Sequence, residues 1–245
     1  MAGVWVRRQR RDRPARVTLF CLPFAGGGAG AFREWPDLLP DDVEVCPVHL
    51  PGREARFAEP PIDDVEALVG PLLLGLTPHL DGPFALFGHS MGGLIAFELA
   101  DRLRRRGVAP AWFFASGVRG PHRPRRAEPR NGLPDDQFLA AVRQLNGTPP
   151  ELLANPEILE LLLPMLRSDF RLAETYRYLP RPPLDCPVVA FGGRDDPDVS
   201  VEDLEAWRQQ AAGHFEVHVL PGDHFFLSSA RADLLRIIGE RLAGA

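Results

Sequence analysis

Short, almost continuously apolar runs alternate along the chain with longer stretches in which apolar residues recur every three or four positions. β-branched and aromatic residues dominate the short runs, and continuous apolarity is typical of strands buried on both faces of a parallel sheet. The expected strands are residues 16–22, 43–50, 84–87, 112–116, 188–191 and 215–220. The expected helices are residues 65–79, 91–106, 201–212 and 229–242. This alternation predicts an α/β fold with a doubly wound, mostly parallel sheet.

The alternation stops between residues 119 and 183, where a loop rich in Pro and Arg is followed by Leu-rich helical segments. We interpret this part as an inserted helical lid. Asn155-Pro156 is a typical helix start, and Pro164 should kink the helix that follows. Apolar residues recur along this helix at helical spacing: Ile158, Leu159, Leu162, Leu163 and Leu166. Such a stripe either packs the helix onto a core or lines a pocket, and the pattern favours neither.

The composition fits a globular protein with one sizeable core, since 45% of the 245 residues are hydrophobic and 25% are charged. We expect one domain over residues 16–245, with the lid at about 119–183, and a basic N-terminal tail over residues 1–15. The formal net charge of −5 argues against nucleic acid or an anionic membrane surface as the main partner. All 28 basic residues are arginines, so the chain has no lysine for Schiff-base chemistry.

The cysteines and the N-terminus bear on the compartment. The chain has three cysteines, Cys21, Cys46 and Cys186. They lie far apart in apolar runs without metal-ligand spacing, so we expect buried thiols and no metal site. The arginines between residues 7 and 16 precede an apolar stretch, residues 17–31, that imitates a signal peptide. Pro23 and three consecutive glycines interrupt that stretch, so we interpret it as mimicry and expect a cytoplasmic protein without a membrane span.

The strongest motif is Gly88-His89-Ser90-Met91-Gly92, a G-x-S-x-G between an expected strand and an expected helix. A serine on such a strained turn needs glycines two positions away on each side, because a side chain there would collide with neighbouring backbone. The start of the helix also presents unpaired N–H groups and the positive end of its dipole, where negative charge develops during acyl transfer. The motif therefore predicts Ser90 as the nucleophile of a serine hydrolase.

A serine nucleophile needs a histidine base and an acid, which in this arrangement follow it in the order acid, then histidine, on loops after late strands. Of the seven histidines, only His224 lies on a loop directly after the last expected strand. The preceding strand runs into a turn with three aspartates, Asp195, Asp196 and Asp198. The spacing from Gly193 favours Asp196 as the acid, whereas Asp195 and Asp198 are expected to cap the turn or the next helix.

The loop after the first expected strand is a candidate oxyanion hole. An oxyanion hole needs a second N–H from such a loop, beside the N–H of the residue after the nucleophile. Residues 21–28 follow the first strand and end in three glycines, which allow the backbone to approach a substrate closely. A glycine run alone is more typical of a flexible turn. Its position here favours the amides of Ala25 and Met91 as the oxyanion donors.

The chain resembles the α/β-hydrolase superfamily and, within it, the stand-alone type II thioesterases that serve modular polyketide and nonribosomal peptide synthases. The resemblance spans nearly the whole chain from residue 16. Besides the G-x-S-x-G turn, which is called the nucleophile elbow, it rests on residues 22–27, 50–56, 191–193, 196–197 and 221–226. The segment Pro51-Gly52-Arg53-Glu54 is the most discriminating, because general esterases and lipases share the elbow but usually carry an HGGG-type oxyanion loop. The residues before Arg16 have no counterpart in the family.

The resemblance implies an α/β-hydrolase fold, the triad Ser90, Asp196 and His224, and oxyanion amides at Ala25 and Met91. It implies hydrolysis of acyl thioesters from the phosphopantetheine arm of an acyl or peptidyl carrier protein, in editing or product release. We expect no cofactor, no nucleic acid, no membrane and a monomer. Two alternatives remain open: a small-ester or lipid hydrolase with the same triad, and a hydrolase-like binding protein that retains the pocket without the chemistry.

Several arginines lie outside these motifs. The segment of residues 119–130 holds five arginines and His122. It either steers an acidic carrier protein or is a solvated part of the lid, and its composition favours the second. Arg53 and Arg56 are expected to organise the pocket entrance through ion pairs with Glu54 or Glu59, without touching substrate.

Overall fold

The computed structural model describes residues 4–8, 15–125, 128–145, 147 and 155–244. Within these ranges the chain forms a six-stranded parallel sheet in the order β2-β1-β3-β4-β5-β6. The strands are β1 (Val17–Leu22), β2 (Val43–Pro47), β3 (Phe84–His89), β4 (Trp112–Ser116), β5 (Val188–Gly193) and β6 (Phe215–Leu220). The predicted doubly wound parallel sheet is confirmed, with small differences at the strand ends.

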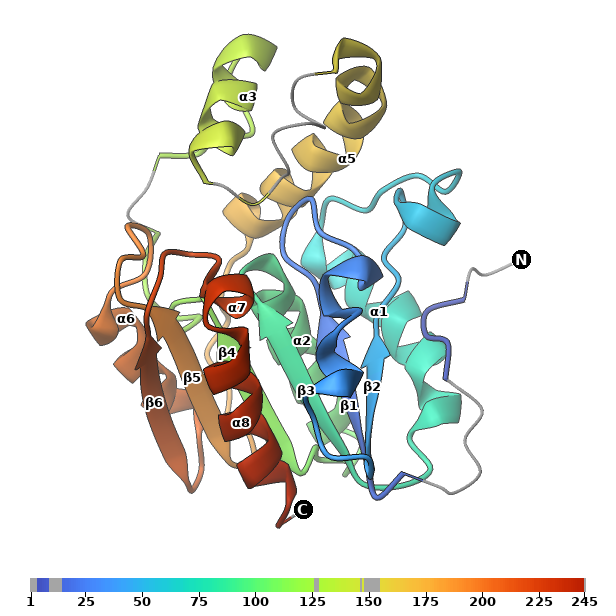
Figure 1. Cartoon of the computed structure of the whole chain (residues 1–245), viewed down its shortest axis with the longest axis vertical. Coiled ribbons are helices and arrows are strands. Elements are labelled where there is room, and N and C mark those ends of the chain that lie inside the picture. Colours follow the sequence, from blue (N-terminus) through green and yellow to red (C-terminus); the bar gives the residue numbers. More distant parts are fainter. Residues whose placement is uncertain (1–3, 9–14, 126–127, 146, 148–154, 245) are drawn as a thin grey trace.

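Hydrophobic clusters cover both faces of the sheet because successive side chains of a strand point to opposite faces. In β1, Phe20 and Leu22 join one cluster, whereas Leu19 and Cys21 join the other. The first cluster holds α1 (Val65–Leu76), α2 (Met91–Arg104) and the region of α6 (Val201–Glu205). The second holds α7 (Phe226–Ser229) and α8 (Arg231–Leu242), and Figure 1 shows α8 in front of the sheet. This double coverage explains the continuous apolarity of the strands.

All four predicted helices are shorter or more broken than their periodicity indicates, and the expected helix 91–106 ends at Arg104. The expected helix 65–79 ends as α-helix at Leu76 and continues as a 3-10 turn, Thr77–His79, because Pro78 has no N–H to donate to the carbonyl four residues before it. The expected helix 201–212 divides into α6 and the 3-10 segment Ala206–Gln210. The expected helix 229–242 is interrupted at Ala230, between α7 and α8.

The segment between β4 and β5, which we interpret as an inserted lid, contains α3 (Asp135–Gln144) and α5 (Pro156–Thr175), which lie beyond the carboxyl ends of the strands in Figure 1. Asn155 caps α5, because its side chain accepts hydrogen bonds from two backbone amides of the first turn. Pro164 lies inside α5 without ending it. The apolar stripe of α5 packs against Phe138 and Val142 of α3, so of the two interpretations of the stripe, packing holds.

The N-terminal segment departs from the expectation of a frayed basic tail. Trp5 and Val6 are only 5% and 3% exposed, and Val6 forms an antiparallel bridge with Val48. The guanidinium of Arg56 lies 4.0 Å from the centre of the Trp5 ring, and the ring also covers Gly75, where a Cβ atom would lie 2.0 Å from it. The apolar residues Val4, Trp5 and Val6, directly before a run of arginines, are too short a pattern to predict this docking. Residues 9–14 of the expected tail lie outside the described residues.

Two further expectations concern the thiols and membrane-spanning helices. All three cysteines are free and buried, as predicted. No helix among the described residues is both long and apolar enough to cross a membrane.

A buried ion pair fastens the segment after α5 to α2. Arg181 lies 2.6 Å from Glu98 and 3.1 Å from Asp101, and all three side chains are less than 8% exposed. The hydroxyl of Tyr176 donates to Glu98 at 2.7 Å. This cluster holds the segment that follows α5 against α2. Removing one partner would leave a buried charge uncompensated.

We therefore expect Glu98→Ala to lower the free energy of unfolding by about 3 kcal/mol, measured by urea denaturation. The matched control is Arg236→Ala, because Arg236 pairs with Glu240 on the surface at 2.8 Å with both side chains at least half exposed. That control should change the free energy by less than about 0.5 kcal/mol. Equal effects of the two variants would show that the buried pair has no special role.

Candidate active site

Ser90 lies on the turn between β3 and α2 with φ 54° and ψ −117°, a conformation that L-residues rarely adopt. The turn is possible because the flanking residues are glycines, which have no side chain to collide with the neighbouring backbone. A Cβ atom on Gly88 would lie 2.2 Å from the carbonyl oxygen of Gly92, and one on Gly92 would lie 2.2 Å from that of Leu22. The local geometry is therefore the strained elbow that the G-x-S-x-G motif predicts.

His224 and Asp196 reach Ser90 from two neighbouring loops at the carboxyl edge of the sheet. His224 follows β6, and its Nε2 lies 3.0 Å from Oγ of Ser90. Its Nδ1 lies 2.7 Å from Oδ2 of Asp196, which follows β5. The two loops approach so closely that a Cβ atom on Gly193 would lie 2.1 Å from the carbonyl oxygen of Asp223. The structure thus brings together the three residues predicted as a triad.

The hydrogen bonds favour one tautomer of a neutral His224 ring. An ionised carboxylate can only accept, so Nδ1 of His224 carries the proton and Nε2 is left to accept from the Ser90 hydroxyl. Asp196 is oriented by its other oxygen, Oδ1, which accepts from the amides of Asp198 at 2.8 Å and Val199 at 3.2 Å. The Asp196 side chain is fully buried and that of His224 is 11% exposed. The pair is therefore preorganised to take a proton from Ser90.

The other two aspartates of the turn do not cap the next helix, which is one of the two roles expected for them. Asp195 is exposed, and Asp198 faces Arg130, with 3.4 Å between carboxylate and guanidinium. The cap of α6 is Ser200, which forms a reciprocal capping box with Asp203. The expectation that Asp195 or Asp198 caps this helix is wrong, because a serine placed directly before the helix satisfies its amides.

His89, inside the elbow motif, is excluded as the base by its surroundings. It is fully buried, with Nδ1 2.9 Å from Oγ of Ser116, and its Nε2 has no hydrogen-bond partner among the described residues. Burial and the neighbouring His224 hold the pKa of His89 well below its usual value. The ring therefore remains neutral and supports the loop of His224 by packing, with ring centres 5.2 Å apart.

The loop after β1 carries the predicted oxyanion donor at Ala25. The neighbouring amides are occupied: Gly26 donates to Asp169 at 2.7 Å and Gly27 to the carbonyl of Phe24 at 2.9 Å. Among the described residues, the amides of Ala25 and Met91 have no acceptor, and both residues line the cavity beside Ser90. Both amides are therefore free to donate to a substrate oxygen.

The oxyanion loop is held by a buried ion pair that the sequence analysis missed. Arg53 makes two hydrogen bonds to Asp169 of α5, at 2.7 and 2.6 Å, with side chains 7% and 2% exposed. Arg53 also donates to the carbonyl of Gly27 at 2.9 Å, and Asp169 accepts from the amide of Gly26. A signal for this role exists: Asp169 interrupts the apolar face of α5, next to Phe170.

Glu54 and Glu59 are the carboxylates expected to pair with Arg53 and Arg56. Arg56 pairs with Glu59 at 2.6 Å, as expected. Within the part of the chain that the structure describes, Glu54 does not pair with an arginine but accepts from the amides of Ala29 and Gly30, both at 2.9 Å, because unpaired amides of the glycine-rich loop attract a carboxylate. The neighbouring His49 and these amides lower the pKa of Glu54 to about 2.

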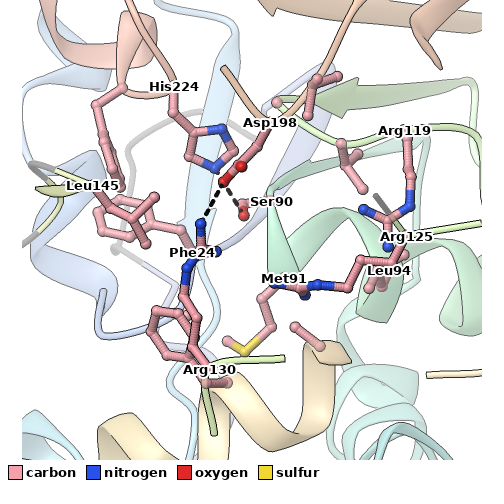
Figure 2. Close-up of a pocket in the computed structure, with 17 residues that line it drawn as sticks. Phe24, Ser90, Met91, Leu94, Arg119, Arg125, Arg130, Leu145, Asp198 and His224 are labelled. Atoms are coloured by element: carbon pink, nitrogen blue, oxygen red, sulfur yellow. Dashed lines mark hydrogen bonds and ion pairs between the residues drawn. The ribbon is translucent and has the colours of Figure 1, made fainter. Parts of the chain in front are cut away.

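A cavity opens beside Ser90 and His224 (Figure 2). Its apolar lining comes from both the main domain and the lid: Phe24, Leu94, Val118, Leu145, Phe170 and Val199. Arg119, Arg125 and Arg130 also line it, and Arg123 pairs with Asp203 at 3.4 Å. These arginines are therefore not the solvated lid segment that composition favoured. Arg126 lies outside the described residues.

A parallel sheet with a nucleophile elbow after β3, an aspartate after β5 and a histidine after β6 defines a serine hydrolase of the α/β-hydrolase class. The model of the thioesterase domain family matches residues 17–242. The chain therefore belongs to the thioesterase family.

Individual relatives agree with this family. The chain is 48% identical over 242 residues to linear gramicidin dehydrogenase LgrE of Brevibacillus parabrevis, covering 97% of this chain and 92% of the relative. It is 41% identical over 239 residues to gramicidin S biosynthesis protein GrsT of Aneurinibacillus migulanus, covering 97% and 93%. The solved structure of the type II thioesterase BorB, from the borrelidin biosynthetic cluster, matches with a TM-score of 0.88 at 36% identity, covering 99% and 98%. The resemblance to type II thioesterases is confirmed.

The acid of the site can be tested by exchanging single aspartates. Asp196→Asn should lower kcat for a short acyl thioester about 10⁴-fold, because an amide can hold His224 in the wrong tautomer. The control is Asp195→Asn, since Asp195 is exposed on the same turn and should keep wild-type activity. Asp198→Asn should cost much less than Asp196→Asn; the reverse order would move the acid to Asp198.

The buried pair beneath the oxyanion loop has its own test. Asp169→Asn should lower kcat about 100-fold, because it loosens the loop that carries the Ala25 amide. Glu59→Gln is the matched control, since it unpairs Arg56 in the same segment without touching that loop. Steady-state kinetics and thermal unfolding are measured for both variants. A full loss of kcat in Glu59→Gln as well would contradict a specific role for Asp169.

Proposed function

We propose that this protein hydrolyses acyl thioesters carried on the phosphopantetheine arm of acyl or peptidyl carrier proteins, through an acyl-Ser90 intermediate. The observation that carries the proposal is the relay of two hydrogen bonds, 3.0 Å from His224 to Ser90 and 2.7 Å from His224 to Asp196, beside an open cavity. Membership of the thioesterase family and similarity to the type II thioesterase BorB support the thioester as the bond that is cleaved.

In the first half of the reaction, Oγ of Ser90 attacks the thioester carbonyl while Nε2 of His224 takes the hydroxyl proton. The carbonyl oxygen becomes an oxyanion, which accepts hydrogen bonds from the amides of Ala25 and Met91. The N-terminus of α2 adds the positive end of its dipole at the same place. The carbon–sulfur bond then breaks, and the thiol leaves with the proton from His224, so Ser90 carries the acyl group.

In the second half, a water molecule attacks the acyl-Ser90 ester while His224 again acts as the base. The tetrahedral intermediate uses the same two amides, and its collapse releases the carboxylic acid and restores Ser90. Asp196 holds the His224 ring in place and stabilises its cation in both halves. A thiol is a stronger acid than an alcohol, so protonation of the leaving group matters less here than in ester hydrolysis.

The biological role that fits this chemistry is removal of stalled or aberrant acyl units from a synthase, or product release. The relative GrsT is named for gramicidin S biosynthesis and BorB comes from a borrelidin cluster, which supports a modular synthase as the partner system. The free, buried cysteines are compatible with a reducing compartment, and we place the enzyme in the cytoplasm.

The name of the relative LgrE raises hydride transfer as a rival activity. A dinucleotide site in an α/β protein uses the amides of a glycine-rich loop after the first strand to bind the pyrophosphate. Here the carboxylates of Glu54 and Asp169 already occupy the amides of Gly26, Ala29 and Gly30. The loop is thus built around internal carboxylates, which favours hydrolysis over nucleotide binding.

The test is mass spectrometry of carrier proteins loaded with acyl groups from acetyl to medium chains, with a matched free ester in the same assay. We expect loss of the acyl group from the carrier, faster than ester hydrolysis, and a drop of at least about 10⁴-fold in Ser90→Ala. Circular dichroism verifies that Ser90→Ala is folded. Faster cleavage of the ester would favour a general esterase, and no turnover of either would favour a binding protein.

A further inference from the structure

Three guanidinium groups line the cavity next to the nucleophile, from Arg119, Arg125 and Arg130. In Figure 2, Arg119 and Arg125 lie on the side of Met91 and Leu94, and Arg130 reaches toward Asp198 from the other side. A cavity for a plain hydrocarbon chain needs no cation, because holding a charge beside apolar surface costs free energy unless the charge is paired. The partners of the three arginines therefore matter.

Two of the three arginines have carboxylate partners. Arg125 lies 3.0 Å from Glu174 of α5, whose side chain is 1% exposed. Arg130 lies 3.4 Å from Asp198. Glu174 also accepts from the backbone amide of Arg130 at 2.9 Å, so both arginines are tied to α5. Arg125 and Arg130 are thus accounted for by the construction of the cavity wall.

Arg119 differs from the other two arginines. Its Nε donates to the carbonyl oxygen of Arg123 at 3.3 Å, but among the described residues it has no carboxylate partner and its terminal nitrogens have no acceptor. The two carboxylates that act on Arg119 from a distance, Asp203 and Asp198, are paired with Arg123 and Arg130. Burial and the charge of Arg125 lower the pKa of Arg119, and the more distant carboxylates of Asp203 and Asp198 offset this only in part.

The residues around Arg119 suit a short chain that ends in an anion. Val118, its neighbour after β4, lines the cavity together with Val199 and Leu94. These apolar side chains can contact methylene groups that extend from the carbonyl carbon attacked by Ser90. A guanidinium next to them offers a planar pair of N–H donors, which matches a carboxylate.

We propose that Arg119 binds a carboxylate at the far end of the acyl group, so that the enzyme prefers carboxylated acyl thioesters, such as malonyl or glutaryl, over neutral ones. The inference rests on the proposed function and specifies the substrate class of the same site. The reaction is unchanged: water cleaves the carbon–sulfur bond, the thiol and a dicarboxylic acid are released, and the distal carboxylate takes no part in bond making.

A second source of an anion is the phosphate of the phosphopantetheine arm. The phosphate stands at the opposite end of the arm from the thioester, whereas the acyl group begins at the carbon that Ser90 attacks. Arg119 lines the same cavity as Ser90 and is flanked there by apolar side chains, which favours the acyl carboxylate. The test separates the two sources by using arms with and without phosphate.

The experiment measures kcat/KM for two matched pairs of thioesters, malonyl with butyryl and glutaryl with hexanoyl, each on pantetheine and on phosphopantetheine. A blank without enzyme corrects for spontaneous hydrolysis. The readout is the ratio of carboxylated to neutral substrate within each pair. Arg119→Leu should lower this ratio about 10- to 100-fold, because a hydrogen-bonded charge contact is lost, and Arg119→Lys should restore part of it.

The matched control is Arg123→Leu, which removes an arginine of the same loop that pairs with Asp203 outside the cavity; this variant should keep the wild-type ratio. An unchanged ratio in Arg119→Leu, with neutral thioesters still hydrolysed, would overturn the inference and leave the proposed function standing. A loss that follows the phosphate instead of the acyl carboxylate would overturn it too. No hydrolysis of any thioester by the wild type would overturn the proposed function itself.

Discussion

The positive φ of Ser90 is the constraint on which the site depends. An L-residue adopts that conformation only where its surroundings hold it there. They do so because Gly88 and Gly92 lie against backbone that admits no side chain. The turn places Oγ of Ser90 at the carboxyl edge of the sheet, where the loops after β5 and β6 present Asp196 and His224. The order of the strands and the positions of the glycines therefore determine where these three side chains lie.

A second constraint links the lid to the oxyanion loop. Arg53 and Asp169 form a buried pair, and through Gly26 and Gly27 they hold the backbone that directly follows Ala25. Breaking a buried pair costs more than breaking a surface pair, because one charge is left uncompensated. Helix α5 is thus part of the machinery that shapes the oxyanion donors, in addition to covering the cavity.

The sequence predicts the local features well and the long-range contacts poorly. The elbow, and the positions of Asp196 and His224, follow from spacing and from strands with strong apolar patterns. Trp5 docks onto residues far along the chain, and Asp169 finds Arg53 across 116 positions, so no local pattern reveals either contact. The ion pairs of Arg123, Arg125 and Arg130 escape prediction for the same reason, since their carboxylate partners lie on distant elements.

We propose that the acyl group is bound covalently to Ser90 before water releases it. The most direct measurement is rapid acid quenching of the enzyme mixed with an acyl-loaded carrier protein, followed by peptide mapping by mass spectrometry. We expect the mass of the acyl group on the peptide that contains Ser90, within the first turnover, and its absence in Ser90→Ala. Loss of the acyl group from the carrier with an unmodified Ser90 peptide, or with the acyl group on another residue, would contradict it.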